Sequence, residues 1–160
     1  MDYVFDTSAI VVLVETCGIA SQLKQLGNSV ALLTTQTVIN EYSAGTRSTR
    51  NIGIVSNIFS KVAVNSDPKL LPYFSYDASS GEFSVLTYVL QDPTCRCCVI
   101  DEEFGRTVAK TFELTLKGTV GIILMMKQMG LITRKEVRSI KRSIRASSFY
   151  LSESLLRELK

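Results

Sequence analysis

The sequence contains no histidine. This absence excludes Ser-His-Asp triads, Cys-His nucleophile pairs, ribonuclease sites in which histidine is the acid or base, and zinc sites with a histidine ligand. If the protein is a hydrolase, its chemistry must therefore depend on carboxylates, hydroxyls, lysines or metal-bound water.

Long apolar runs are also missing. The longest, at residues 9–14 and 120–126, are far shorter than the roughly 20 residues of a membrane-spanning helix. The chain starts directly in an expected strand, with no basic segment before it, so we expect no signal peptide. We therefore expect a cytoplasmic protein without a membrane partner.

The spacing of the cysteines does not match a zinc motif. The four cysteines are Cys17, Cys95, Cys97 and Cys98. Without histidine no mixed zinc site can form, so we expect reduced, partly buried thiols. A disulfide from Cys17 to Cys95 or Cys97 is the alternative, mainly for a protein from a hyperthermophile.

The composition is typical of a globular protein. Of the 160 residues, 46% are hydrophobic and 21% are charged, and the formal net charge is +3. This length suits one domain with its own core, which we expect to span residues 1–160. The small positive charge neither requires nor excludes nucleic acid, because the distribution of charge matters more than its sum.

Apolar runs alternate with helical patterns along the chain. We expect strands at residues 2–6, 30–34, 62–65, 97–101 and 114–117. We expect helices at residues 8–16, 19–26, 37–44, 47–60, 79–91, 102–112, 120–129 and 133–146, and a short one capped by Ser152. Capping boxes are predicted at Ser79–Glu82 and Thr133–Glu136. The alternation predicts an α/β fold with a parallel sheet covered on both faces, where ligands bind beyond the carboxyl ends of the strands.

Four carboxylates occupy positions that such a fold could bring together. Asp6 and Asp101 each end an apolar strand. Glu41 lies in mid-helix among small or apolar residues, and Glu82 lies in the first turn of another helix. Each also has a plain structural explanation, as an N-cap, a solvated helix residue or part of a capping box. Together, in a chain without histidine, they favour a Mg²⁺ or Mn²⁺ site, because these ions prefer oxygen ligands and activate water for attack on phosphorus.

Four stretches of the sequence resemble a PIN domain, in particular the small prokaryotic VapC-like branch: VFDTSAIV, NEYSAG, GEFSVL and VIDEEFGRTVAKTFELTLKGTVGIILMMKQMGLI. The resemblance covers essentially the whole chain, and residues 99–132 are its most specific part. It implies a three-layer α/β/α sandwich whose clustered acids bind Mg²⁺ or Mn²⁺ and cleave RNA. Carried over by position, it implies the metal-binding and catalytic acids Asp6, Glu41, Glu82 and Asp101, with Thr7 or Ser8 as a supporting hydroxyl.

The roles of several neighbouring residues stay open in the sequence. Proteins of this type often have an aspartate close before the Gly-Glu pair, whereas Asp77 lies four residues before Gly81. Glu102 and Glu103 directly follow Asp101, and we expect them to support the site or to be solvated. Thr119 precedes a helix start that could hold a phosphate, although a plain N-cap is the simpler explanation.

Basic residues gather on one face of the helix expected at residues 133–146. They are Arg134, Arg138, Lys141, Arg142 and Arg145, with Val137, Ile140 and Ile144 opposite. This face is either solvated or in contact with an RNA backbone or an acidic partner. Arg106, one turn after Asp101, either pairs with an acid or contacts RNA.

Apolar residues near the carboxyl end predict a homodimer. Residues 122–129 and 149–151 carry more apolar surface than one domain of this size easily hides. Domains of the resembled type also commonly pair.

The combined features predict a metal-dependent endoribonuclease that is the toxin of a toxin–antitoxin pair, with a small antitoxin protein as its partner. The alternative is a catalytically idle PIN-like domain that binds RNA or a protein. A phosphatase of the haloacid dehalogenase type is disfavoured, because such enzymes use a second aspartate at the position of Ser8.

Overall fold

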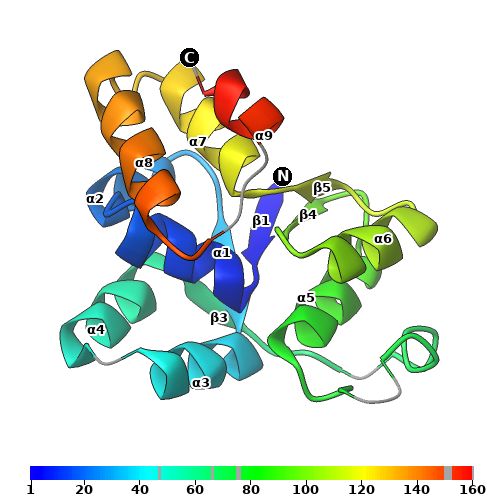
Figure 1. The fold of residues 1–160 in the computed structure, drawn as a ribbon. Coiled ribbons are helices and arrows are strands. Elements are labelled where there is room, and N and C mark those ends of the chain that lie inside the picture. Colours follow the sequence, from blue (N-terminus) through cyan, green and yellow to red (C-terminus); the bar gives the residue numbers. More distant parts are fainter. Residues whose placement is uncertain (47, 66, 75–76, 150–152, 160) are drawn as a thin grey trace.

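The computed structural model describes residues 1–46, 48–65, 67–74, 77–149 and 153–159 (Figure 1). Within them, the strands are β1 (Asp2–Phe5), β2 (Leu32–Thr35), β3 (Ser60–Val62), β4 (Arg96–Val99) and β5 (Leu116–Lys117). The helices are α1 (Thr7–Val11), the π-helix η1 (Val12–Thr16), α2 (Ala20–Leu26), α3 (Gln36–Gly45), α4 (Thr49–Ile58), α5 (Gly81–Leu90), α6 (Glu103–Thr111), α7 (Thr119–Gln128), α8 (Arg134–Ala146) and α9 (Glu153–Glu158).

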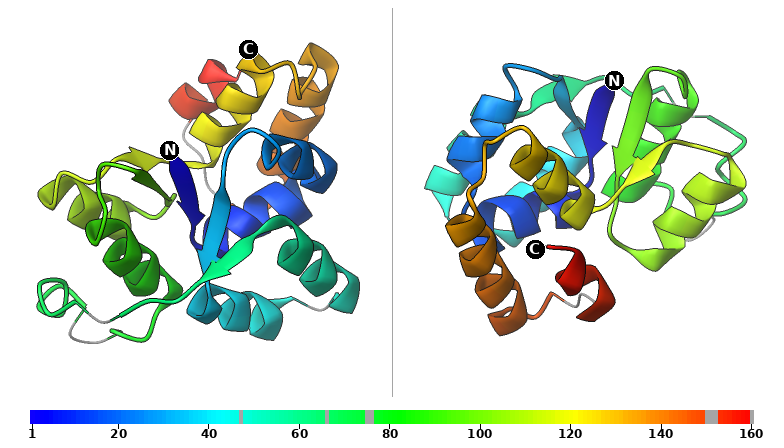
Figure 2. Two further views of the ribbon diagram at one scale, coloured as in Figure 1. Left: turned by 180° about the vertical axis from the view of Figure 1, so that it is seen from behind. Right: turned by 90° about the horizontal axis from the view of Figure 1, so that it is seen from above.

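The strands form one parallel sheet in the order β3-β2-β1-β4-β5. Helices α5 and α6 lie on one side of the sheet, and α1, α2 and α8 lie on the other (Figures 1 and 2). The fold is therefore the expected three-layer α/β/α sandwich. Phe5, the last residue of β1, is in register with Val99, the last residue of β4. This register places the acids that follow the two strands at the same edge of the sheet.

The central strands form the middle of the core. Val4, Phe5, Cys98 and Val99 are completely buried. A strand buried on both faces carries apolar residues at successive positions, which explains the apolar runs at residues 3–5 of β1 and 97–99 of β4.

Two expected elements differ from the structure. The strand expected at residues 62–65 lies at Ser60–Val62, where it pairs with β2 at the edge of the sheet. A short edge strand with exposed polar residues has little periodicity of its own, so its partner decides its position. The helix expected at residues 8–16 begins as α1 and continues as the π-helix η1.

One of the two expected capping boxes is present. Thr133 and Glu136 form it at the start of α8. The box from Ser79 to Glu82 is wrong, because the hydroxyl that accepts the Phe83 N–H at 3.1 Å belongs to Ser80. The Glu82 carboxylate is therefore left for another role. Ser152 lies outside the described residues.

The cysteines differ in burial: Cys97 and Cys98 are buried, Cys17 is partly buried and Cys95 is exposed. All four cysteines are free thiols, so the disulfide alternative is wrong. Ile122, Ile123 and Met126 of α7 are completely buried, whereas Met129, directly after the helix, is 42% exposed. Residues 150 and 151 lie outside the described part. Of the helices in the described ranges, none is long and apolar enough to cross a membrane.

Candidate active site

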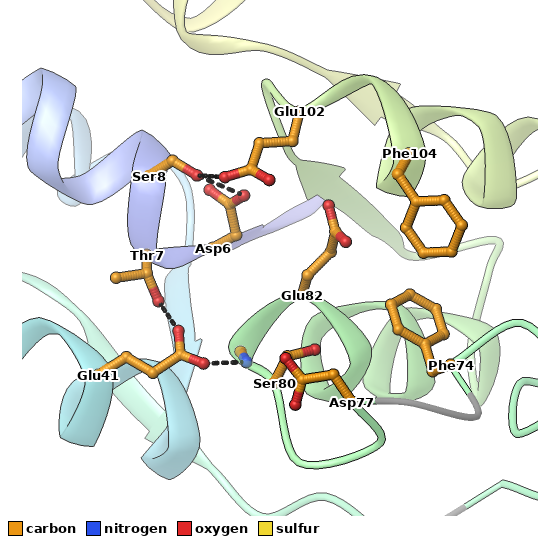
Figure 3. Close-up of a pocket in the computed structure, with 11 residues that line it drawn as sticks. Asp6, Thr7, Ser8, Glu41, Phe74, Asp77, Ser80, Glu82, Glu102 and Phe104 are labelled. Atoms are coloured by element: carbon orange, nitrogen blue, oxygen red, sulfur yellow. Dashed lines mark hydrogen bonds between the residues drawn. The ribbon is translucent and has the colours of Figure 1, made fainter. Parts of the chain in front are cut away.

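A pocket of about 290 Å³ lies at the carboxyl ends of the central strands (Figure 3). It is lined by Asp6, Thr7, Ser8, Glu41, Phe74, Asp77, Ser80, Gly81, Glu82, Glu102 and Phe104. The structure thus brings together three of the four acids that the sequence singled out, Asp6, Glu41 and Glu82. Two further acids, Asp77 and Glu102, lie in the same lining.

Asp6 is the most buried of these carboxylates, with only 3% of its surface exposed. It follows β1 and caps α1, since its Oδ1 accepts the Ala9 N–H at 2.8 Å. Burial raises the pKa of Asp6 well above its usual range, the Ala9 N–H lowers it in part, and the nearby charges of Asp101, Glu82 and Glu102 raise it further. The N-cap explanation is correct, but it does not account for the acidic surroundings.

Glu41 is held by two hydrogen bonds from other helices. Its Oε2 accepts the hydroxyl of Thr7 at the start of α1, and its Oε1 accepts the Gly81 N–H at the start of α5, at 2.6 Å. A Cβ at position 81 would lie 2.5 Å from Oε2 of Glu41, so only glycine permits this close approach. The mid-helix carboxylate therefore joins α1, α3 and α5 at the pocket.

Glu82 has a buried oxygen without a hydrogen bond. Its Oε1 has no partner of good geometry among the described residues. Burial, followed by the charge of Glu102, raises the pKa of Glu82 to about 7; the nearby N–H of Gly105 lowers it only in part, and Glu41 and Asp77 raise it further. An unpaired buried carboxylate oxygen is costly unless something else binds it, and a cation in the pocket would do so.

Glu102 completes the acidic lining. It lies at the N-cap position of α6, directly after Asp101. The Ser8 hydroxyl lies between two carboxylates, 3.0 Å from Oε1 of Glu102 and 3.3 Å from Oδ2 of Asp6. Since a hydroxyl has one hydrogen, Ser8 can donate a hydrogen bond to only one of these two carboxylates at a time. Glu103 is exposed and does not line the pocket.

Asp101 is not among the residues that line this pocket. Its carboxylate accepts the Thr119 N–H at 2.8 Å and also the Thr119 hydroxyl, at the start of α7. It lines a separate cavity of about 340 Å³ together with Arg106, whose Nη1 donates to the Ile100 carbonyl at 2.8 Å. Burial raises the pKa of Asp101, and the Thr119 bonds and Arg106 lower it in part. Thr119 and Arg106 thus surround Asp101 rather than the pocket.

The described residues do not by themselves form a closed metal site. Within them, no group of three or more His, Cys, Asp or Glu side chains is gathered tightly enough to hold an ion. The donors are nevertheless those that Mg²⁺ or Mn²⁺ prefers, since every charged group in the lining is a carboxylate. The buried, unpaired Oε1 of Glu82 and the raised pKa values of Asp6 and Glu82 fit a pocket that lacks positive charge.

Sequence reasoning missed both aromatic residues of the lining, Phe74 and Phe104, and also Ser80 and Gly81. Phe104 lies in the first turn of α6, directly after two glutamates, and it is 51% exposed. A large apolar residue among acids at a helix start was the available signal.

The basic residues of α8 form a different surface. Lys135, Arg138, Lys141, Arg142 and Arg145 line a shallow cavity of about 630 Å³, while Val137, Ile140 and Ile144 are buried against the core. The expected division of this helix into a basic face and an apolar face is therefore present. Arg134 is exposed but lies outside this cavity.

A family model described as a PIN domain (DUF3368) matches residues 2–160. No curated protein and no solved structure matches the chain.

Proposed function

This chain belongs to the PIN-domain family, and from that membership we propose that it is a metal-dependent endoribonuclease whose acidic pocket binds Mg²⁺ or Mn²⁺. PIN domains are in general nucleases. The observation that carries the metal assignment is the buried, unpaired Oε1 of Glu82 in a pocket whose charged groups are all carboxylates. We treat residues 1–160 as one nuclease domain.

The residues that would hold the ion are Asp6, Glu82, Glu41 and Glu102. When bound, a divalent cation would supply the charge that lets these carboxylates share a pocket and the Lewis acidity that phosphodiester hydrolysis needs. The chain supplies orientation: Thr7 and the Gly81 N–H hold Glu41, and Ser8 lies between Asp6 and Glu102. Asp77 at the rim is a further candidate.

In this proposal, Asp101 supports the pocket from outside its lining. Its contacts with Thr119 fix the start of α7, and its charge acts on Asp6. Its direct binding to the ion, which the resemblance implies, stays a prediction. Asp101→Asn would still weaken the site, because it changes the field around Asp6.

The test is cleavage of an RNA pool with Mg²⁺ or Mn²⁺ and with EDTA. We expect EDTA to stop cleavage, and Asp6→Asn and Asp101→Asn each to lose at least roughly a hundredfold in rate. Glu102→Gln and Glu103→Gln are a matched pair, since the two neighbours differ in whether they line the pocket. Glu102→Gln should lose activity, whereas Glu103→Gln should keep it. Full activity in EDTA would overturn the proposal.

The second candidate is an idle PIN domain that binds RNA or a protein. The separation of Asp101 from the pocket lining favours it. Binding of RNA without cleavage, in every divalent cation tried, would select this alternative.

The cellular role and the partners are further proposals. We propose a toxin with a small antitoxin, on the VapC-like resemblance, and the test is whether the neighbouring reading frame encodes a small DNA-binding protein. A homodimer is proposed from the exposed Met129 at the end of α7 and from the pairing common in domains of the resembled type. Light scattering should then give about twice the 17.7 kDa of the chain. A location in the cytoplasm stays a prediction.

A further inference from the structure

One wall of the acidic pocket is aromatic. Figure 3 shows the rings of Phe74 and Phe104 beside each other, next to Glu82. The two ring centroids are 5.1 Å apart, with an angle of 75° between the ring planes. Phe74 makes a second edge contact with Phe83, at 5.2 Å. The pocket thus combines carboxylates with a small packed group of rings.

The two rings at the pocket differ in exposure. Phe74 is 5% exposed and belongs to the core, whereas Phe104 is 51% exposed. No other aromatic ring of the described residues is as exposed as Phe104. Helix α6 does not need the Phe104 ring for its own packing, because its buried residues are Gly105, Val108 and Ala109. The fold therefore accounts for the edge contact of Phe104 with Phe74 but not for the exposure of half of the residue.

The position of Phe104 restricts what could cover it. Without a cation, the carboxylates of the pocket would repel any anion, an acidic peptide and a nucleic acid alike. A nucleic acid strand can approach, because its phosphate would share the cation of the site. Unpaired bases stack on aromatic side chains in proteins that bind single strands, and this stacking tolerates any base because each has a π-face.

We propose that Phe104, supported from below by Phe74, is a stacking platform for an unpaired nucleobase next to the phosphodiester in the acidic pocket. This inference rests on the proposed nuclease function and adds the substrate subsite to it. Paired bases are not free to stack in this way, so the platform favours single-stranded segments over duplex.

A fluorescence experiment tests contact at this ring. The chain has no tryptophan, so Phe104→Trp introduces a single indole at the pocket. Met129→Trp is the matched control, because Met129 is 42% exposed at the end of α7 and outside the pocket lining. Both variants are titrated with a short unstructured RNA in Ca²⁺, and a gel checks that the RNA stays intact. We expect quenching in Phe104→Trp alone; equal quenching in both variants, or none, would overturn the platform.

Binding constants separate stacking from plain apolar contact. Phe104→Ala and Phe104→Leu should each weaken binding of the RNA by about five- to a hundredfold, and Phe104→Tyr should bind like the wild type. An oligomer with abasic positions should bind the wild type and Phe104→Ala equally. If Phe104→Leu retains wild-type affinity, or if the abasic oligomer still distinguishes Phe104→Ala, the ring does not stack on a base.

The outcomes also separate this inference from the proposed function. Metal-dependent cleavage by the wild type, without quenching of the indole in Phe104→Trp, would support the proposed nuclease function and contradict the stacking platform. Quenching of that indole, without cleavage by the wild type in any divalent cation, would support the stacking platform and contradict the proposed nuclease function.

Discussion

Asp6 has two roles, and only one of them depends on its negative charge. As an N-cap it accepts the Ala9 N–H, which an uncharged asparagine can do equally well. As part of the pocket it is buried, and burial together with the nearby charges of Asp101, Glu82 and Glu102 raises its pKa. Without a cation, the negative charge at Asp6 therefore costs stability that the cap alone would not.

Substitution of Asp6 separates the two roles. Asp6→Asn keeps the cap and removes a charge, so we expect the metal-free melting temperature to rise by a few degrees, for about 1 kcal/mol of relief. Asp6→Ala also loses the cap and should melt below Asp6→Asn, by the roughly 1 kcal/mol that such a cap contributes. Melting curves in EDTA and in Mn²⁺ measure both effects. If Asp6→Asn and the wild type melt together in EDTA and respond equally to Mn²⁺, Asp6 is not in a metal site.

Glu82 should make the metal-free protein less stable as the pH rises. Its pKa is raised to about 7 in the folded state, while the unfolded chain has the ordinary value near 4.5. Between these values the folded state binds more protons than the unfolded state, so the free energy of unfolding falls as the pH rises through this window. Melting curves in EDTA from pH 4.5 to 7.5 should show this decline. Glu82→Gln should make the decline shallower, with the remainder due to the raised pKa values of Asp6 and Asp101. An unchanged decline in that variant would contradict the assignment.

At the scale of elements, α3 is fixed from both sides. The Glu15 carboxylate of the π-helix η1 accepts the hydroxyls of Tyr42 and Thr46, each at 2.7 Å. Tyr42 directly follows Glu41, so the same helix is tied to η1 by one residue and to α1 and α5 by the other. The position of Glu41 is therefore a property of several packed helices.

Helix α6 offers a substitution that separates helix stability from the site. A Cβ at Gly105 would lie 2.0 Å from Oε1 of Glu82, so Gly105→Ala must displace that side chain. Alanine favours a helix over glycine by about 1 kcal/mol, and Glu82 can turn away. We expect Gly105→Ala to melt no lower than the wild type in EDTA but to gain less stability from Mn²⁺ and to cleave RNA more slowly. An unchanged response to Mn²⁺ would show that Glu82 does not bind the ion.

At the scale of the whole molecule, charges of opposite sign occupy different surfaces. Carboxylates line the pocket at the ends of the strands, and the basic face of α8 lies on the other side of the sheet from α5 and α6 (Figure 1). The net charge of +3 conceals this separation. A nuclease with an acidic site needs a basic surface elsewhere to attract its substrate.

The basic face of α8 should contribute to RNA affinity through phosphate contacts. We expect the triple variant Arg138→Gln, Lys141→Gln, Arg142→Gln to bind RNA more weakly and to reduce the slope of log affinity against log salt by about 2, if all three side chains contact phosphates of a single strand. Anisotropy titrations at several salt concentrations measure this slope. The control loses the same charge elsewhere, at the exposed residues Lys24, Lys69 and Lys110. Equal losses in the two triple variants would show that α8 makes no specific contact.

The sequence by itself determined the class of fold and the neighbourhood of the site. Unbroken apolar runs and helical periodicity are local properties, so the strands 2–6 and 97–101 and the amphipathic α8 could be predicted within a residue or two. The family resemblance and the lack of histidine pointed to carboxylates, and Asp6, Glu41 and Glu82 do share one pocket.

The tertiary structure alone decided how the side chains are used. Asp101 turns to Thr119, Glu102 enters the pocket, and Ser80 instead of Ser79 caps α5. Phe104 joins the site because α6 packs beside the segment that carries Phe74. The direction of each side chain depends on partners distant in sequence, which local patterns do not specify. The parallel register of β1 and β4, set by packing across the sheet, is what brings these residues to one edge.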